Sequence, residues 1–399
     1  MHLILLTRRG DDELVDMVDS WVNCQVCNSR YAASMSSCPM CGVPNNFVLP
    51  PPAKKRTSVG KVVAGVAIVL VTAALLAMLA PSLIGAISQQ QNEGNPVIRI
   101  LQPRDPESST TVPHEELVEY ALELINKDRE DHGLPPVELG DNQAAQVHAE
   151  DVFRTKQISH WMTNGEKPYM TYTRYGGQGS VQQNVAIAGF SASQYQECRT
   201  NILVNCERID PMSTIEELEY EMMYNDEECC NDGHRNNILD PYHTHVSIGI
   251  AYDQYYLALV QNFENNYGLD VDVDNGHVRI TGELVEGELE QVNIYYDKMP
   301  DSETYEQNKY RLSYSLGELV AIVVRPLPPG YYYETGTNQY SLIEADRWED
   351  GDGDSVDITF NLAEAVEDDG VYTFSAIVKD GDETFDTTSY SVFVDLEEK

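Results

Sequence analysis

Eight cysteines divide into two groups of four, and the first group has the spacing of a metal site. Cys24-Gln-Val-Cys27 and Cys38-Pro-Met-Cys41 are two CxxC pairs with ten residues between them. Two such turns present four thiolates tetrahedrally, which is the geometry of a structural Zn²⁺ site with no open coordination position. A redox dithiol is the alternative, but redox motifs carry one CxxC beside a βαβ pattern, and none is visible in the sequence. We therefore predict a zinc ion that builds a fold and does no chemistry.

The segment that follows this array has the length and composition of a transmembrane helix. Residues 62–87 carry no charge, and the bilayer core needs about 20 apolar residues. A buried core helix is rarely so long, and a cleaved signal peptide would not follow a folded module. The basic residues directly before the span place the N-terminus in the cytoplasm by the positive-inside rule; they are Lys54, Lys55, Arg56 and Lys61.

This topology divides the chain into parts in two compartments. We expect, in order, a cytoplasmic zinc ribbon at 1–50, a basic juxtamembrane segment at 51–61, the transmembrane helix at 62–87, a polar linker at 88–113, and two outward-facing domains at 114–267 and 268–399. The cysteine array resembles the short zinc ribbons at the N-terminus of many prokaryotic membrane proteins. A reducing cytoplasm disfavours disulfides, which also favours metal there. The expected location is the cell membrane, crossed once.

The charge of the chain excludes one class of partner. Among 399 residues, 65 are Asp or Glu and 26 are Lys or Arg, which gives a formal net charge of −39. Nearly all of this excess falls in the two outer domains, so they repel phosphate backbones and we expect no nucleic-acid partner for them. The hydrophobic content of 42% is too high for a disordered chain.

Helical patterns come first in the domain at 114–267, and β patterns follow. An apolar stripe at Leu117, Ala121 and Leu124 predicts a helix that ends before Gly133. A second helix is expected to begin near Asp141 and a third to lie near 214–226. A β-hairpin is expected in which residues 245–252 pair with residues 255–263. Helices packed on an antiparallel sheet indicate an α+β fold or an α-β-α sandwich.

Taken in order, several short segments of this domain resemble the CAP (SCP-like) family of cysteine-rich secretory, plant pathogenesis-related and prokaryotic outer-surface proteins. The segments are Leu124-Ile125-Asn126, Ala145 with His148-Ala149-Glu150-Asp151, Ile158-Ser159-His160, the run from Gly233 to Pro241, Val246 to Ile250, and Gln261-Asn262-Phe263. The match is closest to the prokaryotic branch. The resemblance implies an α-β-α sandwich.

The resemblance also implies a cleft with two histidines and two acidic residues, which hold a divalent metal in some members. The histidines map to His160 and His234, and the second acid maps to Asp226. The first acid falls where this chain has Gln183, whose neutral amide cannot act as a general base. Two imidazoles and one carboxylate could still hold Zn²⁺ with an open position. The alternative is that the histidines only hydrogen-bond loops into place.

His243 and His245 are interpreted as structural, and so is His148, although it could face the same cleft from the second helix. His243 and His245 stand two residues apart at the start of a predicted strand. The sequence has no Gly-x-Ser-x-Gly elbow, so a Ser–His–acid hydrolase is not supported.

The second group of cysteines comprises Cys198, Cys206, Cys229 and Cys230. By the predicted topology they lie outside the cell, so we expect disulfides, with zinc as the alternative. Four cysteines allow three pairings, and the sequence does not choose among them. A bond from the 198/206 segment to the 229/230 segment would staple the stretch that leads to Asp226 and His234.

The domain at 268–399 has short β-rich runs between turn signals, which predict a β-sandwich of the Ig-like class. The proline-rich loop from Arg325 to Tyr333 could contact carbohydrate, but an ordinary interstrand loop is the preferred interpretation. The acidic run from Asp350 to Asp357 departs from an EF-hand at Ser355 and Asn361, so we do not expect calcium there.

These inferences favour a membrane-anchored, outward-facing CAP protein that binds a lipid, a peptide or another envelope component. The first alternative is a metal-dependent hydrolase that uses His160, His234 and Asp226 to activate water. The amide of Gln183 weighs against this alternative, because water activation needs a base or a strongly polarised metal-bound water. The second alternative is a transmembrane sensor that couples an outer ligand to the zinc ribbon.

Overall fold

A computed structural model describes residues 112–396, apart from 202, 285–286, 334–339 and 351–354, and the backbone of three short strands nearer the N-terminus. The chain divides into two compact units, one formed by Met1–Val15 with Thr111–Lys399 and the other by Asp16–Thr110. Within the second unit, β2 (Trp21–Asn23) and β3 (Arg30–Ala32) pair as an antiparallel ribbon. The CxxC cysteines and residues 62–87 lie outside the described residues, so the zinc ribbon and the membrane span remain predictions. Among the helices described, none is long and apolar enough to cross a membrane.

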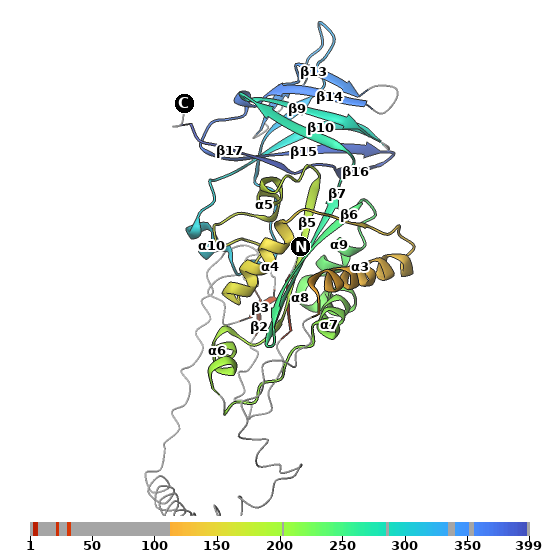
Figure 1. Ribbon diagram of the computed structural model, residues 1–399. Coiled ribbons are helices and arrows are strands. Elements are labelled where there is room, and N and C mark those ends of the chain that lie inside the picture. The colour runs from red at the N-terminus through yellow and green to blue at the C-terminus, as the bar shows by residue number, and fades with distance from the viewer. Residues whose placement is uncertain are drawn as a thin grey trace, which may run out of the picture. The chain divides into compact units, whose positions relative to one another are not determined.

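A five-stranded sheet forms the centre of the domain that begins at α3 (Figure 1). Its strands, in spatial order, are β1 (Leu3–Leu6), β5 (Ser180–Gly189), β7 (Tyr256–Asn265), β6 (His245–Asp253) and β4 (Glu138–Leu139). The three long strands run antiparallel, and β1 and β4 pair in parallel at the two edges. The pairing of β1 with β5 places residues 3–6 at an edge of this sheet. The predicted membrane topology, with residues 1–61 and 88–399 on opposite sides, would require β1 to separate from β5.

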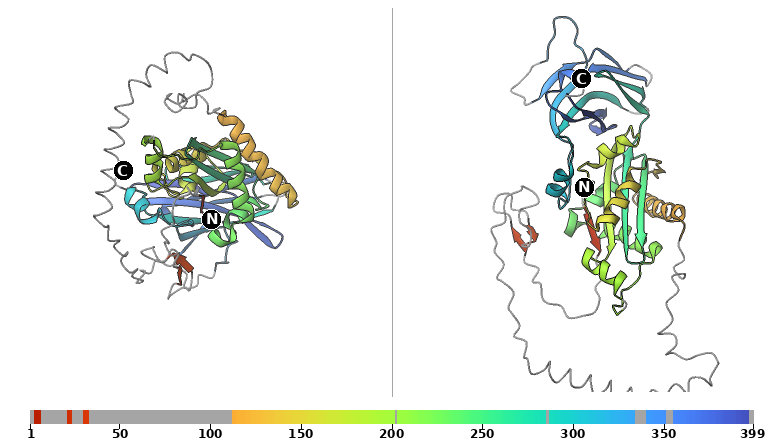
Figure 2. Two further views of the ribbon diagram at one scale, coloured as in Figure 1. Left: turned by 90° about the horizontal axis from the view of Figure 1, so that it is seen from below. Right: turned by 60° about the vertical axis from the view of Figure 1, so that its left-hand side comes forward.

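Helices cover both faces of this sheet (Figure 2). On one face lie α3 (His114–Asp131), α7 (Pro211–Tyr224) and α9 (Gly233–Ile238). On the other face lie α4 (Ala144–Thr155) and α6 (Ala192–Thr200). Two shorter helices, α5 (Pro168–Arg174) and α8 (Glu227–Cys230), stand in the connections. The domain is therefore α+β, as the sequence predicts.

The alternation of side chains along β7 explains this layering. Leu257, Leu259 and Phe263 pack into the core cluster that contains α3 and α7. Tyr256, Ala258 and Val260 pack into the cluster that contains α4. Both sets are buried, because successive side chains of a strand point to opposite faces and each face is covered by helices. Gln261 and Asn262 continue the alternation, so one amide enters each layer.

The structure contains the three helices that the sequence predicts, around 117–131, around 144–153 and near 214–226. It also contains the predicted hairpin of β6 and β7. The strand β5 was not anticipated, although it carries Gln183. Its run of Gln182-Gln183-Asn184 has neither alternation nor β-branched residues, and tertiary pairing with β7 decides its conformation.

The C-terminal region is β-rich, with two sheets that share one apolar core. The larger sheet contains β12 (Ser341–Glu344), β11 (Glu318–Val324), β10 (Glu288–Asp297), β15 (Gly370–Asp380), β16 (Glu383–Asp386) and β17 (Tyr390–Val394). The smaller contains β13 (Arg347–Asp350), β14 (Ser355–Asn361), β9 (His277–Glu283) and β8 (Leu269–Asp274). Phe360 of β14 and Phe374 of β15 meet edge to face with ring centroids 5.6 Å apart, so side chains of the two sheets interdigitate.

The C-terminal region packs directly against the helical domain. Lys167 Nζ lies 2.7 Å from Asp297 Oδ1, and the hydroxyl of Tyr169 donates to the same carboxylate. An apolar cluster joins α5 to this region through Val371, Tyr314 and other side chains. The segment between β10 and β11, which contains α10 (Ser302–Asn308) and Tyr314, therefore lies against the helical domain.

Candidate functional site

His160 stands in the segment that follows α4, and it is hydrogen-bonded to Gln183 of β5. The imidazole Nδ1 lies 3.1 Å from Gln183 Oε1, and both side chains are buried. The Gln183 amide in turn donates from Nε2 to Asn262 Oδ1 at 3.0 Å and lies 3.3 Å from His148 Nδ1. The amide thus occupies the centre of a small buried network.

The partners of this network fix the protonation of its two histidines. Because Gln183 Oε1 can only accept, His160 carries its proton on Nδ1. Because Gln183 Nε2 can only donate, His148 Nδ1 is an acceptor, and its Nε2–H donates to Ser159 O at 2.8 Å. Burial lowers the pKa of both imidazoles, that of His160 well below its ordinary value. Both rings are therefore neutral, and His148 contacts the predicted site residue Gln183 rather than only packing in its helix.

His234 and Asp226 form the second pair of predicted site residues. His234 Nδ1 lies 2.6 Å from Asp226 Oδ1, and the His234 backbone N–H donates to Oδ2 at 2.7 Å. Both side chains are fully buried. The chain reverses between them because Asn231 and Asp232 have left-handed backbone angles (φ 57° and 58°), which Asn and Asp tolerate better than most residues.

The opposite face of β5 carries a network that the sequence did not indicate. Asn184 donates to Gln261 Oε1 at 3.2 Å and to the carbonyl of His234 at 3.3 Å. Gln261 donates to Glu219 Oε2 at 2.6 Å, and burial raises the pKa of the Glu219 carboxyl to about 8. The signal in the sequence is a Gln-Asn pair inside an otherwise apolar strand.

Tyr314 of the C-terminal region covers His160. Its ring lies edge-on to the imidazole with centroids 5.0 Å apart. His160 and His234 have no solvent-exposed surface. The residues that the family resemblance places in a cleft are therefore closed to solvent, and part of the closure comes from the following domain.

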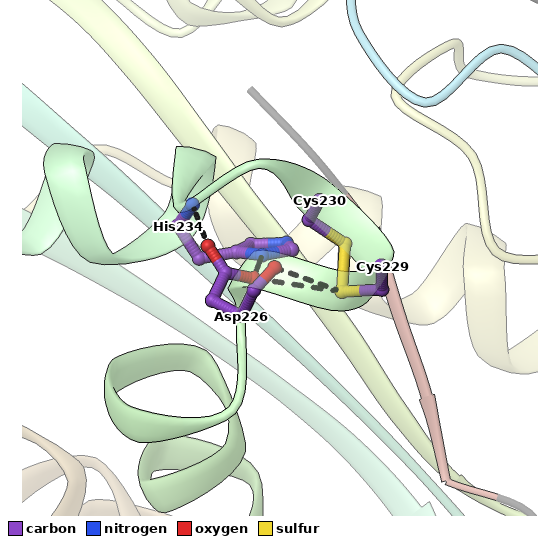
Figure 3. Close-up of side chains that lie close together, drawn as sticks. All are labelled: Asp226, Cys229, Cys230 and His234. Carbon is purple, nitrogen blue, oxygen red and sulfur yellow. Dashed lines mark hydrogen bonds and ion pairs between the residues drawn. A yellow bond between two sulfur atoms is a disulfide. The ribbon is translucent and has the colours of Figure 1, made fainter. Parts of the chain in front are cut away.

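The two disulfides join cysteines within each segment. Cys198 bonds to Cys206, and Cys229 bonds to its neighbour Cys230. The cross-segment staple that the sequence allowed is therefore not formed. The second bond lies beside the Asp226–His234 pair (Figure 3), with Cys229 Sγ 3.6 Å from Asp226 Oδ1.

The other histidines that we interpreted as structural lie at the end of the sheet near β6. His243 is buried, with Nδ1 2.6 Å from Asn265 Oδ1 and Nε2 2.9 Å from Asn237 Oδ1. His245 is half-buried at the start of β6, 3.7 Å from Glu138. Both contacts fit the structural interpretation.

The acidic run and the proline-rich loop of the C-terminal region contact each other. Arg325 forms an ion pair with Asp350, and the hydroxyl of Tyr333 donates to the carbonyl of Arg325. Asp357 pairs instead with Arg279. Residues 351–354 lie outside the described residues. Tyr331 and Tyr332 are exposed.

Residues 122–263 match the cysteine-rich secretory protein family, CAP. The chain therefore contains a CAP (SCP-like) domain, in agreement with the resemblance in its sequence. Among solved structures, an extracellular SCP-domain protein from Bacillus anthracis is 20% identical, with a TM-score of 0.26. The likeness covers 38% of this chain and 41% of that protein, and at this score it supports no further conclusion. No curated protein is similar enough to match.

The donor set of the CAP residues fits a metal only in part. His160 Nε2 is buried without a hydrogen-bond partner, and the tautomer derived above leaves its lone pair available. Gln183 offers a neutral amide that is already bonded on both sides. Asp226 accepts from the imidazole and the backbone N–H of His234, so it orients that ring, as carboxylates that hydrogen-bond to metal-binding histidines do.

Proposed function

We propose that this chain is a membrane-anchored, outward-facing CAP protein that binds a peptide component of the cell envelope without hydrolysing it. The observation that carries the proposal is the closure of the CAP residues. His160 lies beneath Tyr314, and the position expected to hold a base holds the amide of Gln183. A hydrolase needs solvent access and a base or a metal-bound water; here the site is closed to solvent, and the amide of Gln183 cannot act as the base.

A hollow lined by residues of both the CAP domain and the C-terminal region supports binding. It has a volume of about 690 Å³, within the usual range of ligand sites, and lies between the end of α4 and α10. The residues that line it are mostly polar or charged and come from both domains: Thr155, Gln157, Thr163, Ser302, Glu303, Tyr305, Glu306 and Lys309. Such a lining suits the amides and charged groups of a peptide better than an acyl chain.

The proposed location follows from chemistry in both halves of the chain. The Cys198–Cys206 disulfide in the CAP domain suits an oxidising exterior. The apolar run at 62–87 supplies the anchor, and the four N-terminal cysteines would hold a structural zinc ion on the cytoplasmic side. We further propose an Ig-like sandwich for the C-terminal region, whose role would be to complete the hollow.

The test uses the full chain in detergent micelles and three probes: a defined peptide library, anionic phospholipid vesicles, and a glycan array. We expect peptide binding that Lys309→Glu weakens at least tenfold. The matched control is Lys127→Glu on α3, an exposed lysine that does not line this hollow and pairs with Asp131. Binding to vesicles or glycans alone, or turnover of the bound peptide, would contradict the proposal.

The unpartnered Nε2 of His160 favours a second candidate, a metal-dependent hydrolase. In that case His160 and His234 would be ligands and Asp226 would orient His234. We expect a chain whose four N-terminal cysteines are replaced by serine to retain stoichiometric zinc, and to lose it in His160→Gln, if this candidate is right. A zinc-free chain would rule it out.

A further inference from the structure

The Cys229–Cys230 disulfide contributes little to holding the fold together. It joins neighbours in sequence, so it closes the smallest loop a disulfide can close. Because a disulfide stabilises mainly by restricting the unfolded chain, and the effect grows with loop length, this bond restricts almost nothing. We therefore looked for a role of this bond other than that of a stabilising cross-link in the CAP domain.

The surroundings of this bond are those of a metal site. Asp226, Cys229, Cys230 and His234 each bring one donor atom, and all four atoms lie within 4.8 Å of one another (Figure 3). Donors around tetrahedral Zn²⁺ lie about 3.3–3.8 Å apart, so modest side-chain movement would bring these four into range. Asp226, Cys230 and His234 are buried, and Cys229 is exposed.

We propose that this disulfide is reducible and that its reduced form binds a thiophilic divalent cation, such as Zn²⁺, through Asp226, Cys229, Cys230 and His234. The bonded sulfurs of the oxidised form are not thiolates, and the thiolate is the form that binds metal. Oxidised protein therefore offers only the carboxylate and the imidazole. The disulfide and the metal are alternative occupants of the same pair of sulfurs.

A dithiol reductant can supply the two electrons that reduce the Cys229–Cys230 disulfide. A thiolate of the reductant attacks the Sγ of exposed Cys229, the S–S bond breaks, and the electron pair leaves on Cys230 Sγ. The second thiol of the reductant then displaces Cys229 from the mixed disulfide. The chain gains two electrons and two protons, and the reductant becomes a disulfide. Binding of the cation then releases the thiol protons.

This site differs from the metal site implied by the CAP resemblance, because it uses two cysteines and neither His160 nor Gln183. It also does not rest on the proposed peptide binding, and its test is separate. Asp226 and His234 belong to both metal sets, so the test detects sulfur coordination directly rather than metal content alone.

The experiment uses the full chain in detergent with Cys24, Cys27, Cys38 and Cys41 replaced by serine, which removes the predicted zinc ribbon. The protein is reduced with a phosphine, its thiols are counted by mass spectrometry, and Co²⁺ is titrated in. We expect one equivalent of Co²⁺ with a thiolate-to-cobalt charge-transfer band and the visible bands of tetrahedral cobalt. The oxidised protein should show no thiolate band.

The variants assign the band to its ligands. Cys229→Ser/Cys230→Ser should abolish it, whereas the matched control Cys198→Ser/Cys206→Ser should keep it. Asp226→Asn should weaken Co²⁺ binding by about tenfold or more. The absence of a thiolate band in reduced protein with free thiols at 229 and 230, or its persistence in Cys229→Ser/Cys230→Ser, would overturn the proposal. Should the double variant fail to fold, Cys230→Ser alone should shift and weaken the band.

Discussion

The ring of Tyr314 stands edge-on to the imidazole of His160, with centroids 5.0 Å apart, although the two residues are 154 positions apart in the chain. One belongs to the CAP domain and the other to the segment between β10 and β11. The environment of the first CAP histidine is thus completed by a different domain, and its solvent access depends on how that segment packs.

Tyr314→Ala should therefore expose His160. We expect the pKa of the imidazole to rise toward its ordinary value because burial is the main cause of its depression. The unfolding free energy should fall by about 2 kcal/mol or more, since an aromatic contact between domains is lost. Modification of His160 by diethyl pyrocarbonate, followed by mass spectrometry, measures the exposure. Tyr332→Ala, at a position 82% exposed, is the control and should change neither quantity.

Gln183→Glu should restore the carboxylate that the CAP resemblance leads one to expect. A carboxylate cannot donate to Asn262 or His148 as the amide does, so we expect a loss of about 1–3 kcal/mol in stability. The negative charge should raise the pKa of His160 and tighten Zn²⁺ binding by about tenfold or more. Zinc titration of the variant measures this, with Gln182→Glu on the opposite side of β5 as control. Unchanged zinc affinity would show that position 183 does not face a metal site.

Glu219 should make the stability depend on pH in a definite direction. Its folded pKa of about 8 lies above the ordinary 4.5, so the folded chain holds the proton more tightly than the unfolded chain does. Stability should therefore fall as pH rises from 4.5 to about 8, by up to about 5 kcal/mol. Glu219→Gln should flatten this slope in denaturant titrations, whereas Glu217→Gln, exposed on the same helix, should not. A wild-type slope of opposite sign in the same pH range would contradict this assignment.

The two disulfides should differ in their effect on stability. Cys198–Cys206 closes a loop with a sequence separation of 8, for which chain entropy predicts about 2.5 kcal/mol. Its removal in Cys198→Ser/Cys206→Ser should lower the thermal midpoint accordingly. Cys229→Ser/Cys230→Ser should lower it much less, because the same expression gives only about 0.6 kcal/mol for a separation of 1. Equal losses in calorimetry would refute the entropic argument.

The membrane topology can be tested by protease access. We expect residues 1–61 to be cleaved only in inverted membrane vesicles and the CAP domain to be reached only from outside intact cells. Reporter fusions at each end provide an independent readout. Cleavage of both parts from the same side would refute the anchor and would agree with the pairing of β1 and β5.

The sequence predicted the longer helices and the β6–β7 hairpin because their apolar periodicity is strong and local, and the family resemblance of several short segments in order predicted the CAP domain. It did not predict that Tyr314 covers His160, since that contact depends on the packing of two domains. It also left the disulfides open, because three pairings satisfy the same spacing. The buried position of Glu219 was missed for a related reason. A glutamate in an amphipathic helix is expected to be solvent-exposed, and only the folded sheet brings Gln261 close enough to donate a hydrogen bond to it.

The amides of β5 and β7 bear on how the sheet assembles. Gln183 lies opposite Asn262, and Asn184 opposite Gln261, so each pair meets on one face. A shift of the strands by two residues would set Gln183 against Val260 or Glu264, and a shift by one would turn every side chain to the wrong layer. Misaligned pairing would leave buried amides without partners. The two amide pairs therefore select one register of β5 against β7, so the central strands pair in a single alignment during folding.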